Sequence, residues 1–200
     1  MAKLHFRYGA MNAGKTAILI QTAYNYEERD QKAILIKPSV DTKGDSNVVS
    51  RIGIKRTVDE LIGPDDSVMK KVEKYLEDVD CILVDEAQFL KSSQVDELFY
   101  ITKLYNVPVI AFGLKTNFKT EGFEGSKRLL ELADALEEMP TICRCGKKAR
   151  FNARKVNGRF VRDGDCVVID DGKDDVSYES LCGACYIKKV LKLQKEDIRK

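Results

Sequence analysis

The first stretch of this sequence that could do chemistry is Gly9-Ala10-Met11-Asn12-Ala13-Gly14-Lys15-Thr16. It fits the pattern G-x-x-x-x-G-K-[ST] of a phosphate-binding loop, in which glycines let successive backbone N–H groups face a polyphosphate. The lysine of this pattern reaches the β- and γ-phosphates, and the hydroxyl that follows it is placed to ligate Mg²⁺. The pattern therefore predicts that the chain binds a nucleoside triphosphate, with Lys15 on the phosphates and Thr16 on the metal.

An acidic pair, Asp85 and Glu86, directly follows the short apolar run Cys81–Val84. In folds with a phosphate-binding loop, an aspartate at such a strand end is expected to hold the Mg²⁺ that accompanies the nucleotide. The neighbouring glutamate can then take a proton from an attacking hydroxyl or orient an attacking water. The pair thus predicts either phosphoryl transfer or ATP hydrolysis, because both reactions need a carboxylate at this place.

Four of the six cysteines form two close pairs, Cys143-x-Cys145 and Cys182-x-x-Cys185. Four thiolates are enough for a closed tetrahedral Zn²⁺ site, and such a site leaves no open coordination position, so the metal is expected to be structural. The alternative is a set of free or redox-active thiols, since Cys-x-Cys is less common than Cys-x-x-Cys. Cys81 and Cys166 lie in apolar runs and are expected to be small buried side chains.

Strand and helix patterns surround the phosphate-binding loop as that motif requires. Residues 3–8 alternate between polar and apolar, and residues 17–24 are apolar at helical spacing. Further on, strands are expected at 33–36, 81–84 and 108–112, and helices at 68–79, 95–105 and 129–136. Strands that alternate with helices predict an α/β fold with a parallel sheet, and a ligand at the carboxyl ends of its strands.

Two segments depart from this alternation. Residues 39–63 are polar and glycine-containing, and we expect a long loop with one short strand at most. From 141 to 186 the chain has short strands, turns and paired cysteines, with a hairpin turn expected at 156–159. We therefore predict a nucleotide-binding core at 1–139, a zinc-binding domain at 140–190 and a charged tail at 191–200, with a Lys-rich helix expected from Ile187 onward.

The composition of the 200 residues is that of an ordinary globular chain, with 44% hydrophobic and 33% charged residues. The formal net charge of +2 neither demands nor excludes a nucleic-acid partner, and we expect none. Charged residues near the start argue against a signal peptide, and no apolar run could cross a bilayer. A cytoplasmic protein without a membrane partner is expected.

Together these motifs resemble those of the type II, or cytosolic-type, thymidine kinases, in their bacterial branch. The resemblance rests on Gly9–Thr16, Asp85–Phe89, Gly113–Phe118 and the four paired cysteines, and it runs over nearly the whole chain. It implies a RecA-like P-loop core, a zinc-bound lasso domain and a homotetramer. The implied reaction transfers the γ-phosphoryl group of ATP to the 5′-hydroxyl of thymidine or deoxyuridine, which salvages precursors for DNA synthesis.

The resemblance also implies roles for single residues. Glu86 corresponds to the general base, and Thr16, Asp41 and Asp85 correspond to the residues that bind Mg²⁺. Beyond the loop itself, the residues implied to bind ATP and its phosphates are Lys43, Asp85 and Gln88. The residues implied to contact the nucleoside are Met11, Phe89, Leu114, Phe118, Phe123, Val168, Ile169 and Tyr178.

Two positions differ from the usual pattern of that family. Lys43 stands where an arginine is usual, so the charge is kept but the bidentate fork is lost. Asp170 and Asp171 stand where two glycines are usual, and Tyr178 follows later than expected. The backbone of the lasso must take a different path there, which bears on the recognition of the base and not on phosphoryl transfer.

Two other functions fit the residues alone. A RecA-type ATPase stimulated by nucleic acid, with a zinc appendage, would show a basic groove and salt-dependent DNA binding. A catalytically silent nucleotide-binding or zinc adaptor protein would most naturally have lost Lys15, Asp85 or Glu86, and all three are present.

Overall fold

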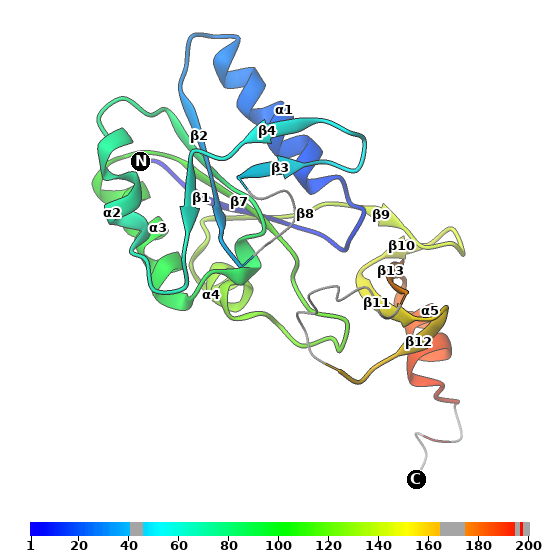
Figure 1. Cartoon of the computed structure of the whole chain (residues 1–200). Helices are drawn as coiled ribbons and strands as arrows, with labels where there is room; N and C mark the ends of the chain where they lie inside the picture. Colours follow the sequence, from blue (N-terminus) through cyan, green and yellow to red (C-terminus); the bar gives the residue numbers. More distant parts are fainter. Residues whose placement is uncertain (41–45, 165–174, 195–196, 198–200) are drawn as a thin grey trace. The chain divides into compact units, whose positions relative to one another are not determined.

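The computed structural model describes residues 1–40, 46–164, 175–194 and 197 (Figure 1). The chain divides into two compact units. The first comprises Met1–Tyr8, Gly14–Lys115 and Phe123–Met139. The second comprises Gly9–Ala13, Thr116–Gly122 and Pro140–Lys200, so two short segments that precede residue 140 pack with the C-terminal part. The division into domains at residues 140 and 190 stays a prediction.

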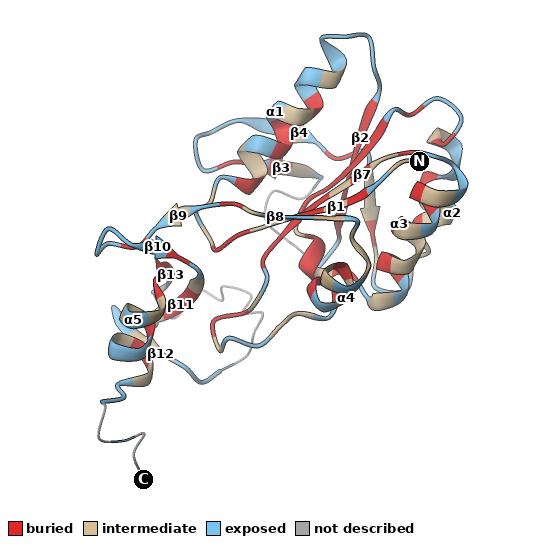
Figure 2. Cartoon of the chain, turned by 180° about the vertical axis from the view of Figure 1, so that it is seen from behind, coloured by how far each residue is buried: buried red, intermediate tan, exposed pale blue. Residues whose placement is uncertain are grey.

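A parallel six-stranded sheet forms the centre of the first unit, in the order β5-β2-β6-β7-β1-β8. Its strands are β1 (Leu4–Tyr8), β2 (Ala33–Pro38), β5 (Glu60–Ile62), β6 (Cys81–Val84), β7 (Val109–Gly113) and β8 (Ala135–Glu138). Every residue of β2 and β6 is buried, as expected for central parallel strands that are covered on both faces (Figure 2). The predicted α/β fold with a parallel sheet is confirmed.

Helices cover both faces of this sheet. They are α1 (Lys15–Glu27), α2 (Val68–Val72), α3 (Ser92–Leu104) and α4 (Glu124–Leu132), and Figures 1 and 2 place α1 on one side and α2 and α3 on the other. Alternate strand residues such as Ile34 and Ile36 share one core with Val68 of α2, Leu98 of α3 and Leu129 of α4. No helix in the described ranges is both long and apolar enough to cross a membrane.

The segment after β2 contains more strands than we predicted. It holds β3 (Asn47–Val49) and β4 (Lys55–Thr57), which form an antiparallel hairpin, and then β5, which pairs with β2 as an edge strand of the main sheet. Each has only three residues, too few for a period of two to stand out from the polar surroundings. Their hydrogen bonds come from pairing partners, which local sequence does not reveal.

Two predicted helices end earlier than their sequences suggested. The segment 68–79 is helical in α2 and then forms a 3₁₀ turn at Glu73–Tyr75. Helix α4 ends at Leu132, and Leu136, predicted on its inner face, lies in β8 and is 50% exposed. Asp134 accepts a hydrogen bond from the backbone of Leu4, which holds this segment along the open edge of β1. Strand pairing there overrides the helical preference of the segment.

The second unit is built on a three-stranded antiparallel sheet in the order β12-β11-β13. Its elements are β9 (Thr141–Ile142), β10 (Lys148–Ala149), β11 (Phe151–Val156), β12 (Arg159–Val161), β13 (Val176–Leu181), the short helix α5 (Gly183–Tyr186) and a π-helical turn (Ile187–Leu191). The predicted hairpin turn is confirmed, because Asn157 and Gly158 both have positive φ and Val156 pairs with Arg159. In the described part of the tail, the regular helix stops at Leu191, since Lys192 is left-handed.

The contact between α4 and the turn after β6 gives a test of the fold. A Cβ at Gly125 would lie 2.6 Å from the backbone oxygens of both Ala87 and Leu90. We expect Gly125→Ala to lower the free energy of unfolding by about 2 kcal/mol, because backbone atoms cannot move aside cheaply. This loss should appear although alanine favours a helix over glycine by about 1 kcal/mol.

Chemical denaturation measures the effect. The control is Lys127→Ala, an exposed change in the same helix, which should shift stability by less than about 0.5 kcal/mol. A Gly125→Ala variant as stable as the control would show that the turn at Ala87–Leu90 does not depend on this close approach.

Candidate active site

In the first unit, the start of α1 meets the end of β6. Asp85 follows the fully buried strand β6, and its backbone N–H donates to the carbonyl of Ile36 in β2. The hydroxyl of Thr16, in the first turn of α1, donates to Oδ2 of Asp85 at 3.3 Å. The structure thus brings two of the three predicted Mg²⁺ ligands together. The third, Asp41, and the predicted phosphate contact Lys43 lie outside the described residues.

The side chains of Lys15 and Asp85, which lie at this edge of the sheet, are both buried. Burial, together with the negative charge of Glu86, raises the pKa of Asp85 to about 7, even though hydrogen bonds from the Glu86 N–H and the Thr16 hydroxyl favour the charged carboxylate. Burial also lowers the pKa of Lys15, while the carboxylates of Glu86 and Asp85 raise it. A carboxylate with an adjacent hydroxyl suits a hard cation such as Mg²⁺, and a buried ammonium suits phosphate oxygens.

Glu86 is held in a strained backbone conformation by its neighbours. Its φ of 48° lies in the left-handed region, which a non-glycine residue adopts at a cost. The Gln88 side chain donates from Nε2 to Oε2 of Glu86 and accepts at Oε1 from the N–H of Leu114 at 3.0 Å. Because only the amide oxygen can accept that N–H, the Nε2 group must face the carboxylate.

Gly113, at the end of β7, leaves room for the side-chain amide of Gln88. A Cβ at Gly113 would lie 2.8 Å from Oε1 of Gln88, so glycine is required for Gln88 to reach Leu114. Sequence reasoning assigned Gln88 to ATP and missed its contact with Glu86, since nothing in a linear motif indicates which way a side chain turns. Its role toward ATP stays a prediction.

The predicted nucleoside contacts fall into both units. In the first, the rings of Phe89 and Phe123 meet edge to face with centroids 5.6 Å apart, and Leu114 accepts a hydrogen bond from Ser126 at its carbonyl. In the second, Phe118 is 2% exposed, and its carbonyl accepts from the Tyr186 hydroxyl at 2.6 Å. Val168 and Ile169 lie outside the described residues.

Tyr178, the predicted lasso tyrosine, lines a cavity of about 280 Å³ in the second unit. Asn12 of the phosphate-binding loop and Ser180 of β13 line the same cavity. Within the second unit, a predicted nucleoside contact, Tyr178, therefore lines the same cavity as Asn12 of the predicted phosphate-binding loop. The nucleoside roles of these residues stay predictions.

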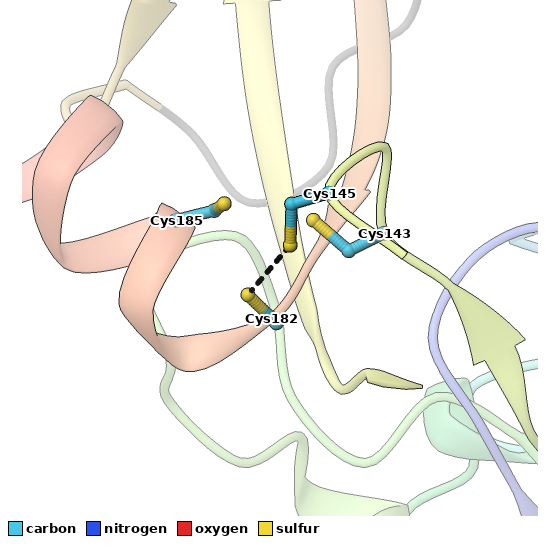
Figure 3. Close-up of side chains that lie close together, drawn as sticks. All are labelled: Cys143, Cys145, Cys182 and Cys185. Atoms are coloured by element: carbon cyan, nitrogen blue, oxygen red, sulfur yellow. Dashed lines mark hydrogen bonds between the residues drawn. The ribbon is translucent and has the colours of Figure 1, made fainter. Parts of the chain in front are cut away.

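The four paired cysteines come together in the second unit (Figure 3). Their Sγ atoms all lie within 4.8 Å of one another, and those of Cys145 and Cys182 are 3.5 Å apart. Zn–S bonds of about 2.3 Å in a tetrahedron place sulfur atoms roughly 3.8 Å apart, which matches this spacing. In Figure 3 the side chains converge from the β9–β10 turn and from the start of α5.

The lowered pKa values of Cys143 and Cys182 also suit metal binding, because a thiolate and not a thiol is the ligand. Hydrogen bonding by the backbone N–H of Cys145 lowers the pKa of Cys143 to about 6, and that of Cys185 lowers the pKa of Cys182. Contact with Cys145 raises the pKa of Cys185 to about 12. Four adjacent thiolates would repel one another, and a bound cation removes that repulsion. Cys81 is buried in β6 as predicted, and burial raises its pKa to about 11; Cys166 is outside the described residues.

Sequence reasoning missed Asn152 and Ser180, two buried polar side chains of the second unit. They bind the backbone of Met11 in the phosphate-binding loop. Neither belongs to a recognisable motif, and only the strand register brings them together, so a single sequence holds no signal for them.

The comparisons with known proteins agree on one family. The thymidine kinase family model matches residues 2–186. A thymidine kinase of Francisella tularensis subsp. tularensis is 43% identical over 188 residues, which cover 91% of this chain and 95% of that protein. The thymidine kinase of Enterobacteria phage T4 is 46% identical over 91% of this chain and 94% of its own, and that of Mannheimia succiniciproducens is 42% identical over 96% and 99%.

Among solved structures, a DNA replication initiation factor is similar with a TM-score of 0.42 and 18% identity. The similarity covers 70% of this chain and 40% of that one. Values this low bear on neither the fold nor the function.

The cysteine cluster gives a direct test. We expect the purified chain to hold one Zn²⁺ per molecule, and Cys182→Ser to lose it, because a serine hydroxyl does not replace a thiolate ligand. Elemental analysis after gel filtration measures the metal. The control is Cys81→Ala, which removes a buried thiol of β6 and should retain zinc. Full zinc content in Cys182→Ser, or none in the unaltered chain, would contradict the assignment.

Proposed function

The chain belongs to the thymidine kinase family, and from this premise we propose that it transfers the γ-phosphoryl group of ATP to the 5′-hydroxyl of thymidine, and also of deoxyuridine. The observation that carries the proposal is the family match over residues 2–186, because that range contains every residue predicted for the site. The relatives from Francisella tularensis and phage T4 are thymidine kinases, which favours phosphoryl transfer over ATP hydrolysis stimulated by nucleic acid. Homotetramer formation and a cytoplasmic location belong to the same proposal.

The nucleotide would be bound by the first turn of α1 and by the end of β6. Bound Mg²⁺ would neutralise charge on the β- and γ-phosphates. The Thr16 hydroxyl and the Asp85 carboxylate are 3.3 Å apart and supply oxygen ligands of the kind that Mg²⁺ prefers. Lys15 would place its ammonium on the phosphates. Its burial supports this role, because a desolvated charge interacts more strongly with an anion.

Glu86 would act as the general base. A carboxylate next to the metal-binding aspartate can accept the proton of the 5′-hydroxyl as the oxygen attacks the γ-phosphorus. The hydrogen bond from Gln88 supports this role, because it fixes the direction of the carboxylate before the substrate binds. One carboxylate oxygen is thereby engaged, and the other is left for the substrate hydroxyl.

The nucleoside would lie against aromatic and apolar side chains. Phe89, three residues after Glu86, and Phe123, the residue before α4, form an edge-to-face pair. The backbone N–H of Leu114 donates to Gln88 in the same turn. Contacts from Met11, Phe118, Val168, Ile169 and Tyr178 are proposed on the family resemblance. Asp170 and Asp171 stand where the family usually has two glycines, and we propose that this difference changes how the base is selected.

A phosphoryl-transfer assay tests the proposal. We expect phosphorylation of thymidine and deoxyuridine, with little transfer to deoxycytidine or deoxyadenosine and little ATP hydrolysis without nucleoside. Product chromatography with labelled ATP measures all of these together. ATP hydrolysis without transfer, stimulated by DNA, would replace the kinase with the ATPase alternative.

The role of Glu86 has its own test. We expect Glu86→Gln to reduce kcat by roughly 10²- to 10⁴-fold, the usual contribution of a general base, while the affinity for Mg·ATP is kept. Glutamine has the same length and can still accept from Gln88, so the turn should keep its shape. Glu131→Gln, an exposed position on α4, is the matched control. Turnover by Glu86→Gln equal to that of the control would eliminate the proposed base.

A further inference from the structure

Both backbone groups of Met11 are bound by side chains of the sheet in the second unit. The N–H of Met11 donates to Oδ1 of Asn152 at 2.8 Å, and its carbonyl accepts from the Ser180 hydroxyl. The other end of the Asn152 amide donates from Nδ2 to the carbonyl of Thr116 at 3.1 Å. Because an N–H can only donate and a carbonyl can only accept, these partners fix the orientation of the amide.

Asn152 and Ser180 are direct cross-strand partners. Asn152 of β11 pairs with Ser180 of β13 in the antiparallel register, so both side chains lie on the same face of the sheet. They are 3% and 6% exposed. Two buried polar side chains from adjacent strands therefore bind one residue: Asn152 binds the N–H of Met11, and Ser180 binds its carbonyl. We call this pair of side chains the clamp.

The segment next to Met11 has an uncommon backbone conformation that its surroundings must select. Asn12, the next residue, has a φ of 65°, in the left-handed region that asparagine enters more readily than other non-glycine residues but that is still sparsely populated. The carbonyl of Asn12 accepts a third hydrogen bond, from the Thr141 hydroxyl at 3.2 Å. Such a conformation persists only where its surroundings determine it. In the second unit, three side chains from three strands do so.

We propose that Asn152 and Ser180 are positioning residues for the nucleotide, which hold the first half of the phosphate-binding loop in its binding conformation before ATP arrives. The proposal rests on the proposed function only in that Gly9–Thr16 bind Mg·ATP. Neither residue need touch the phosphates. They lower the conformational entropy that nucleotide binding must otherwise remove from the loop, and such preorganisation raises affinity without new contacts.

The experiment compares Asn152→Ala and Ser180→Ala with the unaltered chain by calorimetric titration with the Mg²⁺ complex of a non-hydrolysable ATP analogue. We expect the Kd to rise about 5-fold for Ser180→Ala and about 25-fold for Asn152→Ala, as for one and two lost hydrogen bonds of modest strength. Ser180→Thr restores the hydroxyl and should restore the affinity. The matched control is Ser177→Ala, an exposed serine of the same strand, which should leave the Kd unchanged.

The direction of the change decides the proposal. If the clamp had to open for ATP to bind, both alanine variants would bind the analogue more tightly, and tighter or unchanged binding overturns the proposal. Zinc content and the unfolding temperature show whether a variant is folded. If Asn152→Ala is not, the comparison of Ser180→Ala with Ser180→Thr decides alone. Analogue binding does not depend on the nucleoside, so an unaltered chain that binds it but does not phosphorylate thymidine would refute the proposed function and leave this test intact.

Discussion

The first unit depends on burying opposite charges at the carboxyl edge of one parallel sheet. Burial by itself disfavours the charged forms of Asp85 and Lys15, and their attraction for each other opposes that cost. Asp85 can lie there only because β6 is apolar on both faces and because its N–H pairs with Ile36 of β2. Lys15 can lie there only because α1 begins at it, after Gly14 with a φ of 74°. The order of the strands and the position at which α1 begins therefore together place Asp85 and Lys15 at the same edge of the sheet.

The turn after β6 shows how the same edge holds a strained residue. Glu86 adopts a left-handed conformation that costs about 1 kcal/mol or more, so the surrounding turn must favour it. Gln88 binds Glu86 and Leu114 from inside the turn, while Gly113 and Gly125 allow β7 and α4 to approach the turn closely. Gly113 and Gly125, which are distant in sequence from Glu86, thus both permit the turn that holds its carboxylate. A Cβ at Gly113 would lie 2.8 Å from Oε1 of Gln88, and one at Gly125 would lie 2.6 Å from the carbonyl oxygen of Ala87, so a larger residue at either position would collide with the turn.

Those features that depend on short-range physics could be predicted from the sequence. The strand, loop and helix around Gly9–Thr16, the central strands, α3 and the Asn157-Gly158 hairpin each have a local signature, and the structure has all of these elements. The cysteine quartet was predicted from spacing and is observed as a cluster. The predictions that were wrong concern segments whose structure is determined by strand pairing. Strand β8 forms because β1 has an open edge, and β5 forms because β2 has one. Helical preference and short polar runs carry no information about such pairing.

The side chains that organise the site are invisible in the sequence for the same reason. Asn152 faces Ser180 only in one register of β11 and β13, and a slip by one residue would turn one member of the pair to the opposite face. Cys182 lies two residues beyond Ser180, and Cys143 lies two beyond Thr141, so the cluster lies at the ends of two of the three strands that reach the loop. A unit with so small an apolar core has little else to hold that register. A metal on the four thiolates would therefore stabilise the register, and through it the backbone of Met11 and Asn12.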